Sequence, residues 1–522
     1  MTFSEIYRTI TKKEWLFISI FAVLVIIVTL IPPLYARLNQ PAGEVYIGIH
    51  YQNSGDWNVY YSYIEQIKQG HFLLKNSFTS EPQNRVFFNP VWIIGGLIAR
   101  IFNLSSIISF QILRVICIPV FCFFAFIFIS YFFKETAKRR ICFLLLLFSG
   151  GFGQYSQLAD GFTFLSLNFS PHLITALILI ILTVLFLLLA WENNSIRYSM
   201  SAGICSLCLF IIQPFVVPTI YLVPFIFIFI YYILKKSHWL TYLKHYIILL
   251  LISLPAVIYY FYLINSDRPT QIYQMQNTLL SPQAWQYILA YGFLVILTAF
   301  GLKPILNSRE NKNYFIVTWL LINIFLLYGP FNFQIRLVEG LHIPVVVIST
   351  FGLFYLYQLI NKLKSVKQYE WLLSGFLVLL CLSVLPISSL AMLKKNINVY
   401  PKYYLDRQEY EAMIWLKNNT QEDEIILSNY SSGNRIAGLT GRTVYLGHGI
   451  QTINWEKKYE NLKWFFSNND NLIEREKFLK DNRIDYLFFG VKERNLGGFS
   501  PGKLVNLKNV YNNDGVSIYK FI

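Results

Sequence analysis

Long apolar stretches alternate with short polar ones through residues 1–393 of the 522-residue chain. Runs such as WLFISIFAVLVIIVTLIPPLY and LITALILIILTVLFLLLA are near or above the ~20 residues that cross a bilayer core. The first run has no small-residue cleavage site, so we expect it to stay as an anchor. The pattern predicts eleven spans, near 15–34, 108–133, 141–157, 172–190, 199–216, 218–234, 246–264, 284–301, 314–328, 343–360 and 371–392.

The polar connections carry an uneven distribution of basic residues. If the N-terminus is cytoplasmic, 17 lysines and arginines fall on the inner connections and seven on the outer ones before residue 394. This bias favours a cytoplasmic N-terminus, and it explains most of the net charge of +16 without a nucleic-acid partner. The apolar stretch 89–102 is too short to span and is expected to lie in the interface or to re-enter. Counting it as a span would put the basic residues 134–140 outside.

The composition changes at residue 394. The whole chain is 55% hydrophobic and 14% charged, against roughly a quarter charged in soluble domains. Residues 394–522 instead have the pattern of a soluble domain, with an amphipathic helix around 413–416, a polar-faced helix in EREKFLKDN, and buried strands in EIILS and IDYLFFG. We therefore expect an extracytoplasmic α/β domain at 394–522. The six cysteines lie in apolar segments, without metal-ligand spacing.

Candidate chemistry collects in three connections that this topology places on the outer side. The first, residues 35–107, holds Asp56. The second holds Asp160 and His172, and the third holds Arg336 and Glu339. The third also holds His342, so a cavity between them would contain two or three carboxylates, two histidines and a guanidinium.

Each of the acids and the histidine also has a structural interpretation. Asp56 follows a glycine and precedes a helical pattern, which is a common helix start. Asp160 lies in ADGF, a turn-like context, and His172 lies at the mouth of a span, where it can serve as a cap. A role in chemistry and a role in capping therefore both stay open for these three residues.

The arginines present a similar choice. Arg336 can pair with Glu339, three residues on, or bind a phosphate through two parallel hydrogen bonds. Arg114 lies inside the second predicted span near its outer end, where an ionisable residue is rare and usually has a function.

Together these segments resemble a known family. The resemblance rests on the acidic first loop, the short helix in FNPVWIIGGLIARIFNLSS, the arginine in FQILRVICIP and the later pieces SGGFGQY, FSPHLITALILI and FQIRLVEGLHIPVVVIS. These segments are similar to the GT-C glycosyltransferases. That family consists of polytopic enzymes and includes protein O-mannosyltransferases and the lipid A aminoarabinose transferase. The resemblance covers nearly the whole chain. It implies a GT-C-type module at 1–393, with a large external loop at 35–107, in the cell membrane.

The resemblance also implies an activity. The enzyme would move a sugar from a polyprenyl-phosphate donor to an acceptor hydroxyl on a glycan, lipid or protein, with inversion. Asp56 would be the general base and Arg336 would hold the donor phosphate, with Arg114 as a second candidate. Asp160, His172 and Glu339 would support the acceptor or a metal.

A divalent cation, Mg²⁺ or Mn²⁺, is a candidate cofactor, provided that the chain has enough carboxylates to bind it. Many members of the family carry paired acids in the first loop, whereas SGDWN has no adjacent second carboxylate. A metal site would therefore need Asp160 or Glu339 to complete it in space.

A transporter or flippase of an envelope lipid is the alternative. Arg114 and the prolines of the apolar segments would suit substrate passage, but the chain shows no two matching halves with broken helices. A structural envelope protein would not need acids gathered on one face. GRTVYLGHG, which contains His448, lacks the spacing of a phosphate-binding loop, so the soluble domain is expected to orient an acceptor or cap the cavity.

Overall fold

The computed structural model describes residues 1–48, 54–150, 159–234, 237–266, 268–362, 394, 403–468 and 471–522. The chain divides into two compact units. The first contains Met1–Ile31, Arg114–Phe261 and Thr278–Lys395, and the second contains Pro32–Leu113, Tyr262–Asn277 and Asn396–Ile522. The residues of the predicted first external loop therefore group with those of the predicted soluble domain. Helices α2, α5 and α11 each contribute residues to both units.

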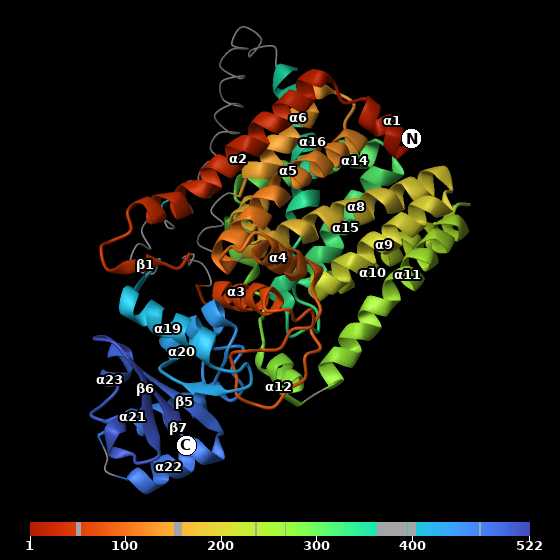
Figure 1. Ribbon diagram of the computed structural model, residues 1–522. Helices are drawn as coiled ribbons and strands as arrows, with labels where there is room; N and C mark the ends of the chain where they lie inside the picture. Colours follow the sequence, from red (N-terminus) through yellow and green to blue (C-terminus); the bar gives the residue numbers. More distant parts are fainter. Residues whose placement is uncertain are drawn as a thin grey trace. The chain divides into compact units, whose positions relative to one another are not determined.

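The first unit is built from helices (Figure 1). They are α1 (Phe3–Arg8), α2 (Lys12–Leu38), α5 (Ser106–Phe132), α6 (Thr136–Phe148), α7 (Thr163–Phe169), α8 (Pro171–Asn193), α9 (Ile196–Ile212), α10 (Val217–Ile233), α11 (Trp239–Ser266), α13 (Ala284–Tyr291), α14 (Phe293–Asn307), α15 (Asn311–Leu326) and α16 (His342–Asn361), with the 3₁₀ turns η2 (Ala159–Gly161), η3 (Pro214–Val216) and η4 (Gln334–Val338).

The expectation of eleven spans can be compared with the helices of the described part of the chain. There, six helical segments are long and apolar enough to cross a membrane, or seven if the pair α13 and α14, bent by 89°, is one span. The predicted spans 141–157, 199–216 and 314–328 coincide with α6, α9 and α15, of 13, 17 and 16 residues. At 1.5 Å per residue these helices are shorter than a ~30 Å hydrocarbon core. The predicted span 371–392 lies outside the described residues.

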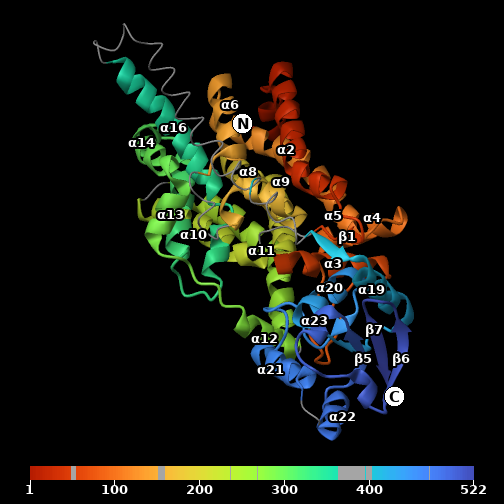
Figure 2. The ribbon, with the colours of Figure 1, turned by 90° about the vertical axis from the view of Figure 1, so that its left-hand side faces the viewer.

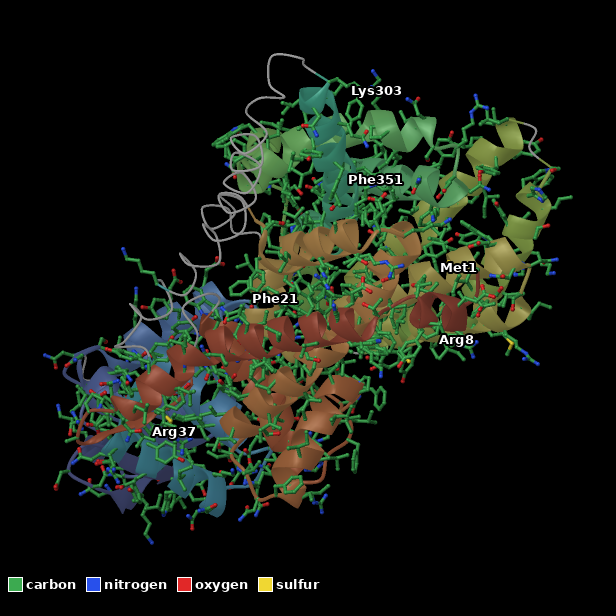
Figure 3. The ribbon with its side chains drawn as sticks, turned by 90° about the horizontal axis from the view of Figure 1, so that it is seen from above. Met1, Arg8, Phe21, Arg37, Lys303 and Phe351 are labelled. Carbon is green, nitrogen blue, oxygen red and sulfur yellow. The ribbon has the colours of Figure 1, made fainter. Side chains whose placement is uncertain are left out.

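Close helix packing and exposed apolar faces characterise this unit. Helices α8 and α9 run side by side, as do α14 and α16 (Figures 1 and 2). A Cβ at Gly301 of α14 or Gly352 of α16 would lie within about 2 Å of a backbone carbonyl oxygen on the other helix. Such small residues let membrane helices approach closely. Helix α2, which carries Phe21 (Figure 3), exposes Leu16, Ile20 and other apolar side chains, as a lipid-facing helix does.

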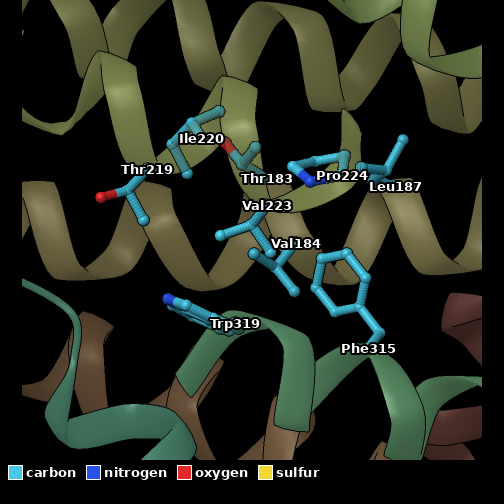
Figure 4. A pocket seen from close by; sticks show the side chains of 9 residues that line it. All are labelled: Thr183, Val184, Leu187, Thr219, Ile220, Val223, Pro224, Phe315 and Trp319. Carbon is cyan, nitrogen blue, oxygen red and sulfur yellow. The ribbon is translucent and has the colours of Figure 1, made fainter. Parts of the chain in front are cut away.

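The interior between α8, α10 and α15 is filled with side chains. A cavity of about 10 Å³ is left there, which is room for roughly one water molecule. Figure 4 shows Phe315 and Trp319 of α15 on one side of it, facing Val184 of α8 and Val223 of α10. This part of the unit is therefore a packed core.

The second unit contains a five-stranded mixed sheet in the order β4-β3-β5-β7-β6. Strand β3 pairs in parallel with β4 and β5, while β7 pairs antiparallel with β5 and β6. The strands are β3 (Ile425–Leu427), β4 (Thr443–Val444), β5 (Ile484–Phe489), β6 (Leu507–Asn512) and β7 (Ser517–Phe521). The α/β character expected for the C-terminal residues is confirmed, including the strands in EIILS and IDYLFFG.

The second unit also contains helices, two of which come from the first loop. They are α3 (Ser54–Lys68), α4 (Pro90–Ile101), α12 (Arg268–Gln276), α19 (Arg407–Asn419), α20 (Tyr430–Thr440), α21 (Trp455–Phe466), α22 (Leu472–Asp481) and α23 (Val491–Arg494), with the 3₁₀ turn η7 (Pro501–Lys503). Helix α20 packs against α3 (Figures 1 and 2). Here Gly438 leaves the space that Asn58 occupies.

Backbone pairing joins the first loop to the C-terminal residues. Strand β1 (Glu44–Tyr46) pairs antiparallel with β2 (Tyr404–Asp406). Further along the loop, the Val444 amide donates to the Ser77 carbonyl at 3.0 Å. The buried Lys458 ammonium lies 2.8 Å from the Glu81 carboxylate. The loop is thus an integral part of the second unit.

Candidate functional site

Asp56 lies in the first turn of α3, which confirms the predicted helix start. A carboxylate there interacts favourably with the positive end of the helix dipole. About 23% of its side chain is exposed. The position therefore stabilises a negative charge that still reaches the surface of its unit.

The partner of Asp56 is a histidine of the C-terminal residues. His448 Nε2 lies 3.0 Å from Asp56 Oδ1. The Gln451 backbone amide donates to His448 Nδ1 at 3.3 Å, so Nδ1 acts as the acceptor. A neutral imidazole has one donor and one acceptor nitrogen, and Nε2 therefore carries the proton that it donates to Asp56.

The loop that carries His448 is held from several sides. The Thr452 hydroxyl donates to the Phe78 carbonyl at 2.7 Å and accepts from the Gly447 amide at 3.0 Å. The Phe78 ring meets the imidazole edge-on. On the other side, a Cβ at Gly55 would lie 2.6 Å from an imidazole carbon of His448. The glycine of SGDWN is therefore required for this contact.

Two tyrosines belong to the same neighbourhood. Burial raises the pKa of Tyr63, and Tyr273 of α12 and Asp56 raise it further. Gln451 Nε2 lies 3.3 Å from the Tyr273 hydroxyl. The site around Asp56 thus draws side chains from α3, α12 and the His448 loop, and Tyr63 stays protonated at neutral pH.

The aromatic residues that follow Asp56 pack against other rings. Trp57 is buried and contacts Phe110, with 4.8 Å between ring centroids. Tyr60 stacks on Trp92 at the same separation. These rings belong to the packing between α3, α4 and α5, so this packing accounts for them without a sugar face.

The first unit holds a second cluster of the predicted residues. Arg336 Nη1 of η4 donates to Asp160 Oδ2 of η2 at 2.7 Å. The sequence left Arg336 a choice between Glu339 and a phosphate, and the structure adds Asp160 of the other loop as an ion-pair partner. About 28% of the Arg336 side chain is exposed, while Asp160 is buried.

Glu339 lies next to this pair and is fully buried. The Gln213 amide donates to Glu339 Oε2 at 2.5 Å. The charges of Asp160 and Arg336 both act on Glu339. Among the described residues, Asp160 Oδ1 and Glu339 Oε1 have no hydrogen-bond partner. Two carboxylates thus share one guanidinium, and the cluster has capacity for a further donor or cation.

Arg114 and His172 take other partners. The Arg114 side chain is 1% exposed and donates to the backbone carbonyls of Leu167 at 3.1 Å and Thr29 at 3.3 Å. The His172 Nδ1 lies 2.6 Å from the Ser170 hydroxyl in the first turn of α8. Their roles toward a phosphate or an acceptor stay predictions.

Sequence reasoning missed two members of these clusters. His448 and Gln213 contact Asp56 and Glu339 from positions far away in the chain. The glycines around His448 in LGHG were a signal of a constrained loop, but the sequence carried no signal for the partner of that loop.

The described residues do not by themselves fit a metal site. They contain no group of three or more His, Cys, Asp or Glu side chains that could hold an ion. Asp160 and Glu339 supply two carboxylates, and substrate phosphate and water would have to supply the remaining ligands of Mg²⁺ or Mn²⁺. His50 of the first loop lies outside the described residues. No step below is therefore assigned to a metal.

Comparison with known proteins identifies the fold. No protein-family model matches the sequence, and no curated protein matches it. Among solved structures, the apo oligosaccharyltransferase of Archaeoglobus fulgidus aligns with 92% of this chain and 70% of its own, at 14% identity and a TM-score of 0.58. ArnT from Cupriavidus metallidurans bound to undecaprenyl phosphate aligns over 98% of both chains, at 10% identity and a TM-score of 0.54.

A third neighbour is the mycobacterial arabinofuranosyltransferase AftD. It matches 98% of this chain and 42% of its own, at 11% identity and a TM-score of 0.53. All three neighbours are GT-C glycosyltransferases, so the predicted GT-C fold is confirmed. The fold and the long apolar helices make the chain a membrane protein.

Proposed function

We propose that this GT-C-fold chain is a membrane glycosyltransferase that moves a sugar from a polyprenyl-phosphate donor to an extracytoplasmic acceptor hydroxyl, with inversion. The observation that carries the proposal is the cluster of Asp160, Arg336 and Glu339. Asp160 and Arg336 are separated by 176 positions and come from two loops, yet they meet in one cluster. Neighbours with this fold include an enzyme bound to undecaprenyl phosphate and an oligosaccharyltransferase in complex with a dolichol-phosphate.

Asp56 is the general base in this proposal. The acceptor oxygen forms a bond to the anomeric carbon while its proton passes to the Asp56 carboxylate. The bond between the anomeric carbon and the phosphate oxygen breaks, and the polyprenyl phosphate leaves with the electron pair. One displacement inverts the anomeric centre and forms no covalent intermediate with the protein.

Arg336 stabilises the departing phosphate. The negative charge on the leaving group grows as the bond breaks, so a guanidinium beside it is worth more in the transition state than in the ground state. Asp160 fixes the guanidinium through Nη1, while the partial exposure of Arg336 leaves the side chain approachable. Arg114 is the second candidate for this role, and Asp160, His172 and Glu339 support the acceptor or donor.

The test is the release of free polyprenyl phosphate by purified full-length protein. Labelled undecaprenyl-phosphate hexoses and pentoses are offered with envelope lipids and glycans as acceptors, with and without Mg²⁺ or Mn²⁺. Wild type is compared with Asp56→Asn, and Asp514→Asn serves as a control because Asp514 is an exposed aspartate in the same unit. Loss of the base is expected to lower turnover by about 100-fold or more.

Each outcome has a meaning. Turnover by wild type and Asp514→Asn, but not by Asp56→Asn, supports the proposal, and the cation response reports whether a metal takes part. Equal turnover in all three proteins would remove Asp56 as the base. Silence of the wild type across the donor panel, combined with movement of labelled lipid across vesicles, would favour the flippase.

A further inference from the structure

We propose that His448 is the positioning residue for the Asp56 carboxylate, so that the C-terminal residues orient the base of the transfer reaction. This inference rests on the proposed function, because it assigns a role toward the base of that reaction. His448 itself does not need to touch either substrate.

The first argument is the direction of the hydrogen bond. Because His448 Nδ1 accepts from the Gln451 amide, the proton lies on Nε2 and points at Asp56 Oδ1, 3.0 Å away. Turning the ring over would put Cδ2 and Cε1 where Nδ1 and Nε2 now lie and would break both hydrogen bonds. The backbone of the loop therefore sets which atom of the imidazole meets the carboxylate.

The second argument is the rigidity of the support. His448 is 10% exposed, and its loop is closed on both sides by the Thr452 hydroxyl and the Phe78 ring. A carboxylate side chain at the start of a helix has two rotatable bonds. A donor fixed on a separate part of the fold removes that freedom, which is the arrangement that keeps a base in attacking geometry.

The third argument is the surroundings of the carboxylate. The titratable groups described around Asp56 are His448 from the C-terminal residues, Tyr63 from its own helix and Tyr273 from α12. Burial raises the pKa of Tyr63, so this phenol is neutral at neutral pH. The imidazole is a group whose donor nitrogen the fold has fixed, so it can set the direction of the carboxylate.

The chain supplies a matched control in a second pair of the same kind. His71 of the first loop contacts the Glu422 carboxylate of the C-terminal residues, and it also links these two parts of the unit. The two histidines are similar in type and in the segments that they join, but His71 does not contact Asp56. Any effect of losing a histidine–carboxylate link in general should appear in both variants.

The experiment uses full-length protein with the donor that supports turnover in the test above. His448→Ala is expected to lower kcat about 10- to 100-fold, with the donor KM unchanged within about twofold, because a misplaced base costs rate and not binding. His448→Gln should recover most of the rate, because its amide can still donate to Asp56. His71→Ala should keep the wild-type rate.

Three results would overturn the inference. One is a His448→Ala rate equal to that of His71→Ala, and another is a His448→Gln rate as low as that of His448→Ala. The third is a further large loss when His448→Ala is added to Asp56→Asn, because a residue that acts through Asp56 has nothing left to act on. The unfolding midpoint of each variant is measured beside its rate, so misfolding is recognised.

The two proposals fail separately. If Asp56→Asn is inactive while His448→Ala is fully active, the base stands and the positioning role is lost. If Asp56→Asn is fully active, the assignment of the base is wrong and the positioning role falls with it.

Discussion

The Asp160 carboxylate and the Arg336 guanidinium form an ion pair of 2.7 Å between two 3₁₀ turns that are 176 positions apart. The pair connects the loop before α7 to the loop before α16. Because Glu339 lies beside it, the single guanidinium compensates more than one buried carboxylate. The stability of this region should therefore depend strongly on Arg336.

Replacing Arg336 by alanine is expected to destabilise the protein by about 3 kcal/mol, the low end for breaking a buried pair, because Arg336 is partly exposed. Adding Asp160→Asn to this variant should recover part of the loss, since one of two like charges is then removed. The measurement is thermal unfolding of the purified protein in detergent. Arg197→Ala is the control, because this exposed arginine belongs to the same unit. A wild-type midpoint for Arg336→Ala would show that the ion pair contributes nothing.

A methyl group at Gly55 should disturb the contact between His448 and Asp56. In Gly55→Ala the new Cβ would lie 2.6 Å from one imidazole atom and 2.7 Å from another, so the ring must move. Alanine favours a helix over glycine by about 1 kcal/mol, so the helix itself is not weakened. We expect transfer to fall about tenfold or more while the unfolding midpoint changes little.

The control for this variant is Gly502→Ala, because a Cβ there meets no atom within 4 Å. Both rates are measured with the same donor and acceptor. Gly55→Ala turning over as fast as Gly502→Ala would mean that the imidazole has room to move without consequence for the reaction.

Acid should weaken the contact between the first loop and the C-terminal residues. The Lys75 ammonium lies 2.5 Å from the Asp423 carboxylate and lowers the pKa of Asp423 below its ordinary value of 3.8. A lowered folded-state pKa means that the stabilisation is complete above about pH 4 and disappears as the pH falls through the lowered value. Because Asp423 is largely exposed, the effect is below about 1 kcal/mol.

This dependence can be measured by comparing wild type with Asp423→Asn. The difference in their unfolding midpoints should be constant at neutral pH and should shrink as the pH falls through the lowered pKa of Asp423. Asp514→Asn should follow wild type throughout. A difference that widens in acid would contradict the assigned sign.

Local sequence patterns predicted the helices and strands, whereas contacts between residues far apart in the chain determine the candidate site. The first turn of α3 with Asp56, the short α4 and the strands at 425–427 and 484–489 follow from capping signals and from runs of apolar residues, which neighbours in sequence determine. Helices α6, α9 and α15 overlap predicted spans but are short, and hydropathy alone does not give the length of a helix.

The contact partners of the predicted site residues could not be predicted from neighbouring residues in the sequence. Nothing near Asp56 in the sequence points to His448, which is 392 positions away, and nothing near Arg336 points to Asp160, which is 176 positions away. The orientation of the 3₁₀ turns and the conformation of the loops determine such contacts. They depend on the whole fold, so the residue types could be predicted and the pairs could not.

The pairing of β1 with β2 has a consequence for how the protein is made. The Tyr404 hydroxyl donates to the carbonyl of Ala36, which left the ribosome 368 residues earlier. At 5–20 residues per second, the first loop waits roughly 20 to 70 seconds for the strand that completes it. During that interval the unpaired edge of β1 can pair with the wrong strand. A chain that ends before residue 404 lacks β2 and cannot form this pairing.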